Sequence, residues 1–385
     1  MDRKKIIYVW KSPYPWDVRV EKICKSLSKE YEVLILARWG NEAKKAEQID
    51  GVTIRRVGFR EKSFKSVPLS FNPFWKRELE TVIKGFKPDA IIVREIMLGT
   101  LVGKLGKKYS IPTIMDMAEN YPAVIKLFKK YKKNFVSRFL IHTLNLAKSV
   151  EKNSLKFIKN LIVVCDEQVE RLKSESYIKN HNFCVVENTP PYDENSKIEK
   201  KFKKPIFGHH GNLTADKSVF EFLQAVIELL DEGYDLEFHI MGNGEIYQET
   251  KKIVDESGYK DKIIMYGNWE DELYKKYLET INFGVLPYAV NDFTNTTNFN
   301  KYYDFLKFGI PVITSDTKPM SRLNNQFGCG ITINVNSIPE IKQSIKQIYN
   351  INYNLLSENA NKAYEERYNW SVDEVELLKF VKEIV

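Results

Sequence analysis

Short apolar segments alternate with stretches of helical periodicity along almost the whole chain. This alternation is typical of βαβ units, in which parallel strands form a sheet and helices cover both of its faces. In the first half of the chain, buried strands are expected at residues 6–9, 33–36, 90–93, 112–115 and 161–164. In the second half, they are expected at residues 206–209, 236–241, 263–266, 283–286, 312–314 and 331–333. The pattern predicts an α/β protein built from doubly wound parallel sheets.

Helical periodicity fills the segments between these strands. In the first half, helices are expected at residues 20–27, 76–83, 101–109 and 135–158. In the second half, they are expected at residues 219–230, 246–257, 270–279, 301–308 and 339–349. Strands and helices therefore follow one another in both halves of the chain.

The length and one polar segment indicate two domains. A chain of 385 residues is too long for one compact core and suits two domains of ordinary size. Residues 188–205 contain Asn-Thr-Pro-Pro followed by charged and polar residues. Because prolines exclude regular structure, this composition is typical of a linker. We predict a first domain at residues 1–190, a linker at 191–205 and a second domain at 206–370.

The bulk composition indicates a globular protein of a reducing compartment. Hydrophobic residues make up 43% of the chain and charged residues 29%. The four cysteines are widely scattered without a CxxC pair, which argues against a disulfide framework or a zinc site. The first apolar segment, residues 6–10, is too short for a signal sequence or a membrane span. We expect a cytoplasmic protein.

The formal net charge of +8 is concentrated in one stretch. Residues 129–159 contain nine Lys or Arg residues and the single acidic residue Glu151, a balance of +8. Apolar residues three and four apart are interleaved with them, which predicts a basic amphipathic helix. Such a helix can lie on an anionic membrane surface, so we expect a peripheral membrane contact. A solvated helix face is the alternative. Nucleic acid is not expected as a partner, because no stacking motif or zinc finger accompanies the charge.

Residues 300–313 are the most informative segment for function. They read Asn-Lys-Tyr-Tyr-Asp-Phe-Leu-Lys-Phe-Gly-Ile-Pro-Val-Ile. Lys301 and Asp304 share one helical face, so a cation for a phosphate and an acceptor for hydroxyl groups can reach one ligand. A surface helix with one ion pair is the plainer interpretation. The segment resembles the nucleotide-sugar signature of GT-B glycosyltransferases, roughly P-N-K-x-F-E-Y-x-x-x-G-x-P-V, in which the acidic residue holds the donor ribose.

The segment from Phe207 to Ser218 resembles a second element of that family, G-R-L-x-x-x-K-G, whose basic residues neutralise the donor pyrophosphate. Lys217 matches the lysine, whereas Asn212 stands where arginine is usual. Gly211 lets the backbone approach a ligand, and the N-terminus of the next helix favours anions. The neighbouring His209 and His210 are candidate ligand contacts, although one of them is expected to point into the core.

Further elements follow in the family's order. Residues 238–245 resemble a strand that ends in I-x-G-x-G-P, and residues 263–270 resemble the V-x-F-x-G segment that precedes the base contact. The loop before the signature carries Thr296 where many retaining members have a glutamate. The resemblance implies a donor site made of Gly211, Asn212, Gly242, Gly267, Asn268, Thr296, Thr297, Asn300 and Asp304.

The first domain carries looser matches. Residues 12–22 resemble the family's first loop, P-x-D-x-R-x-x-K, at the acceptor side. Residues 114–122 are similar to its D-x-H-E segment, although Ala118 replaces the histidine. The resemblance implies acceptor-binding residues Trp16, Asp17, Arg19 and Glu95. It implies catalytic residues Lys217, Lys301, Asp116 and Glu119.

The resemblance covers nearly the whole chain and implies a GT-B, family-4-like glycosyltransferase. Two Rossmann-like domains would face each other across a cleft, and a helix at about 371–385 would complete the first. The implied reaction is retaining transfer from a nucleotide-diphosphate sugar to a glycan or lipid-linked acceptor, in surface polysaccharide or glycoconjugate assembly. No Asp-x-Asp occurs in the sequence, so neither a metal nor a cofactor is expected.

Two alternatives stay open. A GT-B nucleotide-sugar epimerase would use carboxylates of the first domain, such as Glu95, Asp116 and Glu119, as bases. A catalytically inactive subunit that binds a partner would explain the departures at positions 118, 212 and 296.

Overall fold

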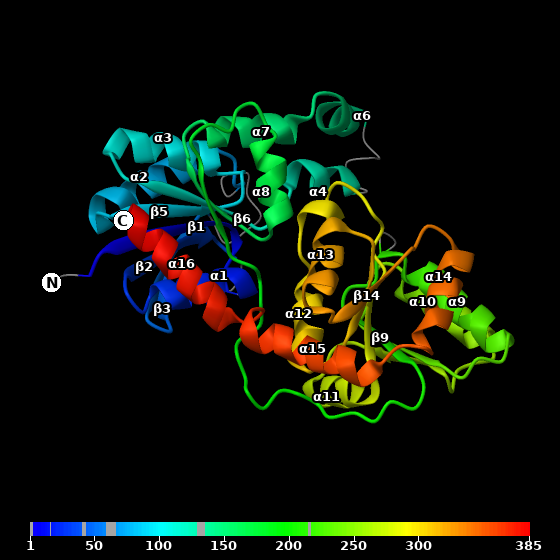
Figure 1. Cartoon of the computed structure of the whole chain (residues 1–385). Helices are drawn as coiled ribbons and strands as arrows, with labels where there is room; N and C mark the ends of the chain where they lie inside the picture. Colours follow the sequence, from blue (N-terminus) through cyan, green and yellow to red (C-terminus); the bar gives the residue numbers. More distant parts are fainter. Residues whose placement is uncertain (1–2, 16, 41–43, 59–66, 129–134, 215–216) are drawn as a thin grey trace. The chain divides into compact units, whose positions relative to one another are not determined.

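The chain forms two compact units, each with its own sheet (Figure 1). The computed structural model describes residues 3–385 apart from 16, 41–43, 59–66, 129–134 and 215–216, and it omits the side chains of 136 and 137. Unit 1 comprises Met1–Glu187 and Asp373–Val385, and unit 2 comprises Asn188–Val372. Residues 191–205 contain no helix or strand.

Unit 1 contains an eight-stranded sheet with the order β3-β4-β2-β1-β5-β6-β7-β8. Every neighbouring pair is parallel except β3 and β4. The strands are β1 (Lys5–Pro13), β2 (Glu32–Arg38), β3 (Ala46–Ile49), β4 (Val52–Val57), β5 (Ala90–Arg94), β6 (Thr113–Met117), β7 (Asn160–Val163) and β8 (Asn182–Val185). The sequence prediction missed β3, β4 and β8, which carry charged or amide side chains and lie toward the sheet edges.

The helices of unit 1 begin at polar capping residues where the chain supplies them. The Asp17 carboxylate accepts hydrogen bonds from the backbone N–H groups of Arg19 and Val20, both at 3.1 Å, and so caps α1. The helices are α1 (Val18–Leu27), α2 (Pro73–Phe86), α3 (Gly99–Tyr109), α4 (Tyr121–Leu127), α6 (Phe135–Arg138), η2 (Phe139–Thr143), α7 (Leu146–Leu155), α8 (Asp166–Lys173) and α16 (Trp370–Ile384). From Asp373 onward, α16 belongs to unit 1.

The predicted single helix over 135–158 is wrong. The chain breaks after the π-helical turn η2, because Asn145 adopts the left-handed conformation with φ 46° before α7 begins. Asparagine visits that region more readily than most residues. Of the apolar residues expected on one face of that helix, Phe135, Phe139, Leu140 and Leu144 are exposed, and Phe135 is 72% accessible. The basic half of the prediction at 129–134 lies outside the described residues.

Unit 2 contains a six-stranded parallel sheet with the order β11-β10-β9-β12-β13-β14. Its strands are β9 (Ile206–His210), β10 (Glu237–Met241), β11 (Ile263–Gly267), β12 (Phe283–Leu286), β13 (Val312–Ser315) and β14 (Gly330–Ile333), all six of which the sequence predicted. Its helices are α9 (Val219–Asp231), α10 (Tyr247–Glu256), α11 (Asp271–Thr280), η4 (Thr294–Thr296), α12 (Asn300–Lys307), α13 (Lys318–Phe327), α14 (Ile338–Ile348) and α15 (Tyr353–Glu366).

Strand order reverses once at the centre of each sheet. In unit 1, β1 lies between β2 and β5, and in unit 2, β9 lies between β10 and β12. In open parallel sheets, ligands bind beyond the carboxyl ends of the strands at such a reversal. Topology alone therefore directs attention to the loops that follow β1 and β5, and to those that follow β9 and β12.

No helix in the described part of the chain is both long and apolar enough to cross a membrane.

Candidate functional site

Glycines bring the loops after β9, β10 and β11 of unit 2 into contact. The N–H of Gly211 donates to Met241 O at 2.8 Å, and the N–H of Gly242 donates to Gly267 O at 2.7 Å. All three predicted glycines have positive φ angles, 118°, 139° and 74° for Gly211, Gly242 and Gly267. A Cβ atom on Gly242 would lie 1.9 Å from Gly211 O, so this approach requires glycine. The structure thus joins the predicted glycines into one surface.

Lys301 lies directly over Gly211. A Cβ atom on Gly211 would be 2.1 Å from Cε and 2.7 Å from Nζ of Lys301. Burial lowers the pKa of Lys301, and the carboxylate of Asp304 acts in the opposite direction. The first turn of α12 therefore places a largely desolvated ammonium group beside a glycine loop, which is a favourable place for an anionic oxygen.

Lys217 folds back onto the same loop. Its ammonium group donates to the backbone oxygen of Asn212 and lies 5.9 Å from the centre of the Tyr288 ring. Both lysines lie close enough to the buried His209 to affect it. The pKa of His209 is lowered to about 3, chiefly by burial and further by the positive charges of Lys301 and Lys217. Its Nδ1 atom contacts the backbone oxygen of Val285 at 2.8 Å, and its side chain is fully buried.

Asp304 faces His210. The Oδ2 atom of Asp304 lies 4.0 Å from Nε2 of His210, and the Asp304 side chain is 38% exposed. Both residues adjoin Lys301, whose charge acts on the pKa of His210. The sequence offered His209 and His210 as equal candidates for a ligand contact. It could not choose between them, because alternation along a strand places the two side chains on opposite faces of the sheet and does not show what each face meets.

The other predicted donor residues are engaged within unit 2. Asn268 accepts a hydrogen bond from Asn243 at 3.1 Å, and Asn300 accepts one from Asn188 at 2.8 Å. The Thr296 hydroxyl donates to Asp292 O at 2.6 Å, inside the short helix η4. Thr296 and Thr297 are both buried. The two threonines therefore support the loop before α12, and their contact with a donor stays a prediction.

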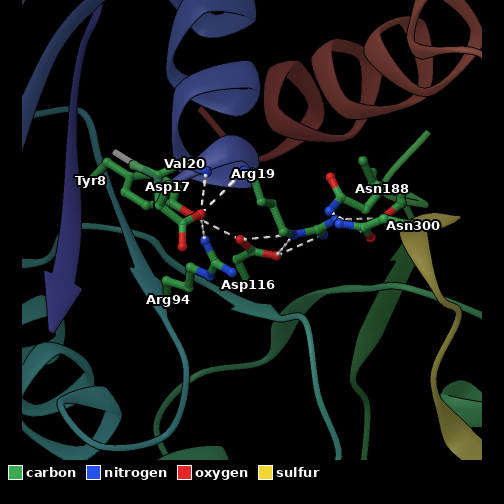
Figure 2. Close-up of polar contacts among 9 residues, drawn as sticks. Tyr8, Asp17, Arg19, Val20, Arg94, Asp116, Asn188 and Asn300 are labelled. Carbon is green, nitrogen blue, oxygen red and sulfur yellow. Dashed lines mark hydrogen bonds and ion pairs between the residues drawn. The ribbon is translucent and has the colours of Figure 1, made fainter. Parts of the chain in front are cut away.

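In unit 1, Arg19 and Asp116 form a buried ion pair (Figure 2). Nε and Nη2 of Arg19 donate to Asp116 Oδ1 at 2.9 and 2.8 Å, and the Tyr8 hydroxyl donates to Asp116 Oδ2 at 2.7 Å. Burial acts to raise the pKa of Asp116, but the charge and hydrogen bonds of Arg19 prevail and lower it. The remaining arm of Arg19 donates to Val186 O at 2.9 Å. This geometry gives Arg19 and Asp116 a positioning role, and direct contact of either with an acceptor or reacting atom stays a prediction.

A second ion pair links β5 to α1. The Arg94 guanidinium bonds the Asp17 carboxylate, as Figure 2 shows, and lies 4.5 Å above the Trp10 ring. Sequence reasoning missed Arg94, although its position at the carboxyl end of a buried strand was a usable signal. Trp16, which was predicted beside Asp17, lies outside the described residues.

Two further carboxyl groups of unit 1, those of Glu95 and Glu119, have raised pKa values. Glu95 is 3% exposed, has a positive φ of 67°, and its Oε2 atom has no hydrogen-bond partner among the described residues. Burial raises the pKa of Glu95 to about 8, and the neighbouring Glu119 adds to this, whereas Arg94 and Lys11 oppose it. Burial also raises the pKa of Glu119. A buried carboxyl with a free oxygen beside a second one is typical of functional sites.

The predicted site residues thus gather at the carboxyl ends of the strands in both units. Those of unit 1 follow β1 and β5 or lie at and after the end of β6. Those of unit 2 lie at or after the ends of β9, β10 and β11 or around the start of α12. Within the described ranges, no three His, Cys, Asp or Glu side chains gather closely enough to hold a metal ion.

Comparison with known proteins identifies unit 2. Residues 191–369 match the model of the family described as Glycosyl transferases group 1. The glycosyl transferases group 1 segment covers nearly all of unit 2, including the glycine loops, Lys301 and Asp304. The predicted resemblance to glycosyltransferases is confirmed, and the predicted class of enzyme is that of the family.

One curated relative matches part of the chain at low identity. Alpha-D-kanosaminyltransferase of Streptomyces kanamyceticus is 21% identical over 145 residues, which are 38% of this chain and 36% of that protein. The similarity thus spans about a third of the relative's length.

Solved structures match the fold over its full length. Sucrose-phosphate synthase from Thermosynechococcus elongatus superposes with a TM-score of 0.75 at 12% identity, covering 99% of each chain. HepE from Anabaena, in complex with UDP, superposes with a TM-score of 0.69 at 12% identity, covering 98% of this chain and all of that one (100%). The predicted GT-B fold with two Rossmann-like domains is confirmed.

Proposed function

We propose that the protein transfers a sugar from a nucleotide-diphosphate sugar to a glycan or lipid-linked acceptor. Unit 2 would hold the donor, and the loops of unit 1 after β1, β5 and β6 would meet the acceptor. One observation supports the proposed donor site in unit 2. The Lys301 side chain lies over Gly211, and Asp304 follows one turn further along the same helix. A desolvated cation, a glycine-lined backbone and a carboxylate are what a diphosphate and a ribose need.

The chemistry that these groups support is electrostatic. The bond between the sugar C1 atom and the diphosphate oxygen breaks, and C1 bonds to an acceptor hydroxyl on the same face. The hydroxyl proton passes to the departing phosphate oxygen, so the reaction retains the anomeric configuration without a separate base. Lys301 and Lys217 stabilise the negative charge that develops on the diphosphate. We propose that the diphosphate is held without a bridging metal. Lys301 and Lys217 both lie at the Gly211 loop, and the sequence has no Asp-x-Asp.

The donor assignment predicts a large effect of Asp304→Ala. If the carboxylate accepts hydrogen bonds from ribose hydroxyls, its loss should weaken nucleotide binding by about 2–3 kcal/mol. A thermal-shift screen of UDP, GDP, ADP, CMP and dTDP selects the nucleotide, and calorimetry then compares the variant with the unaltered protein. Asp255→Ala removes an exposed carboxylate of α10 and serves as the control. Equal nucleotide affinity in all three proteins would contradict the assignment.

A nucleotide-sugar epimerase is the second candidate, favoured by one observation. The raised pKa values of Glu95 and Glu119 suit carboxyl groups that exchange protons with a substrate. Incubation with nucleotide sugars in deuterated water separates the candidates. A transferase releases the nucleotide when an acceptor is added, whereas an epimerase incorporates deuterium into the intact nucleotide sugar. A subunit that only binds gives neither product.

We further propose that the protein is cytoplasmic and that unit 1 docks on an anionic membrane surface through an apolar-basic patch. The patch comprises exposed apolar residues around α6, η2 and the start of α7, namely Phe128, Phe135, Phe139, Leu140, Leu144 and Leu146. Basic residues accompany them, among them Arg138, Lys152 and Lys156. Exposed apolar side chains next to positive charge are typical of surfaces that meet lipid headgroups.

The patch can be tested with charge reversals of equal size. Lys152→Glu/Lys156→Glu should weaken sedimentation with phosphatidylglycerol vesicles, because each basic residue near such a surface contributes about 1 kcal/mol at low salt. Lys275→Glu/Lys276→Glu changes the net charge of the protein equally on α11 of unit 2 and should have little effect. If the unaltered protein binds such vesicles no better than phosphatidylcholine vesicles, the patch is not a membrane contact.

A further inference from the structure

His210, the last residue of β9, is a buried imidazole without a hydrogen bond. It is 3% exposed, and neither ring nitrogen has a hydrogen-bond partner among the described residues. Aromatic rings surround it, with centroid distances of 4.7 Å to Phe305, 5.5 Å to Tyr274, 5.8 Å to Tyr277 and 6.1 Å to Trp269. Because an unpaired buried polar group is costly, two such nitrogens at one position call for a ligand.

The surroundings keep His210 neutral. Burial lowers its pKa, the charge of Lys301 acts in the same direction, and Asp304 opposes both. At neutral pH one ring nitrogen therefore carries a proton and can donate a hydrogen bond, and the other can accept one. A neutral imidazole can bind a hydroxyl group in either direction, so hydroxyl groups are its natural partners.

The geometry opposite His210 offers a second hydroxyl-binding group. The 4.0 Å between Nε2 of His210 and Oδ2 of Asp304 is too long for a direct hydrogen bond. It is short enough for both groups to reach the same hydroxyl or two neighbouring ones. Asp304 is also one methylene shorter than the glutamate of the family signature, so its carboxylate alone reaches less far from α12.

We propose that His210 and Asp304 together bind the vicinal hydroxyls of the donor ribose. The inference rests on the proposed function, in which unit 2 binds a nucleotide sugar. Asp304 accepts hydrogen bonds from the diol, and His210 donates to or accepts from one of its oxygens. The aromatic rings fix the imidazole in place, and the stacked pair Trp269–Tyr274, with centroids 3.7 Å apart, supports that wall.

The test compares ribonucleotides with their deoxy counterparts. Calorimetry measures UDP, GDP and ADP and the matching 2′-deoxy and 3′-deoxy diphosphates on the unaltered protein and on His210→Phe. Phenylalanine keeps the aromatic packing and removes both nitrogens. The unaltered protein should prefer the ribonucleotide, and His210→Phe should reduce that preference about tenfold for one of the two deoxy series. His239→Phe replaces a buried histidine of the neighbouring strand β10 and is the matched control.

The outcomes are separable. If no nucleoside diphosphate binds the unaltered protein, the proposed function fails and this inference with it. If nucleotides bind but His210→Phe keeps the full preference, the inference alone is overturned. Nitrogen NMR of the histidine rings in the unaltered protein gives an independent measurement that needs no variant. The His210 signals should move with the ribonucleotide and not with the deoxy form that lacks its partner hydroxyl, and equal shifts with all forms would also overturn it.

Discussion

Replacing Gly211 by alanine should weaken nucleotide-diphosphate binding by about two orders of magnitude. The new methyl group would lie 2.1 Å from Cε of Lys301, so the lysine must leave its place over the loop. The φ angle of 118° adds backbone strain for any residue with a Cβ atom. The variant thus loses the oriented ammonium group without altering Lys301 itself. Calorimetry with the nucleoside diphosphate selected by the screen measures the loss.

Two controls separate the displaced lysine from general damage. Gly258→Ala also places alanine at a positive φ, 78°, but nothing lies within 4 Å of the added Cβ atom, so nucleotide binding should be unchanged. Lys301→Met removes the charge and leaves the loop intact. If Gly211 serves to seat Lys301, the double variant Gly211→Ala/Lys301→Met should bind about as weakly as Lys301→Met alone. Fully additive losses, or normal binding by Gly211→Ala, would refute this role.

The contact between Gly211 and Lys301 in unit 2 could not be predicted from the sequence. Residue spacing alone placed Lys301 and Asp304 on one face of a helix, because three residues make almost one turn. It could not show which distant loop that face meets, since the two partners are about 90 positions apart. The same holds for His210, whose role depends on the side chains opposite it rather than on its own neighbours in the chain.

In unit 1, the sequence located the site but not its internal pairing. The family resemblance implied acceptor-binding or catalytic roles for Asp17, Arg19, Asp116 and Glu119. Their functional groups were expected to face an acceptor, yet Arg19 and Asp116 turn toward each other. A charged pair of this kind leaves no periodicity in the sequence. The break at Asn145 was equally invisible, because the apolar spacing continues across it.

The second large effect concerns Glu95 and the dependence of stability on pH. The pKa of this carboxyl in the folded protein, about 8, is raised above its ordinary value of 4.5 because the group is buried. Its protonated form therefore contributes stability that is fully present below about pH 4.5 and is lost as the pH rises through about 8. Between those limits the free energy of unfolding should fall by on the order of 4 kcal/mol from this one group.

Glu95→Gln should remove this dependence, because an amide stays neutral at every pH. Denaturant unfolding of both proteins from pH 5 to pH 9 should show the variant gaining stability relative to the unaltered protein as the pH rises. The exposed Glu30→Gln is the control and should follow the unaltered protein throughout. The transfer rate should depend on pH in the same way if the protonated Glu95 donates a hydrogen bond to the acceptor. The rate of the unaltered protein should then fall above about pH 8, and the rate of Glu95→Gln should not. Parallel unfolding curves for Glu95→Gln and the unaltered protein would show that Glu95 is already ionised at neutral pH, and its part in the site would then be that of a charged base.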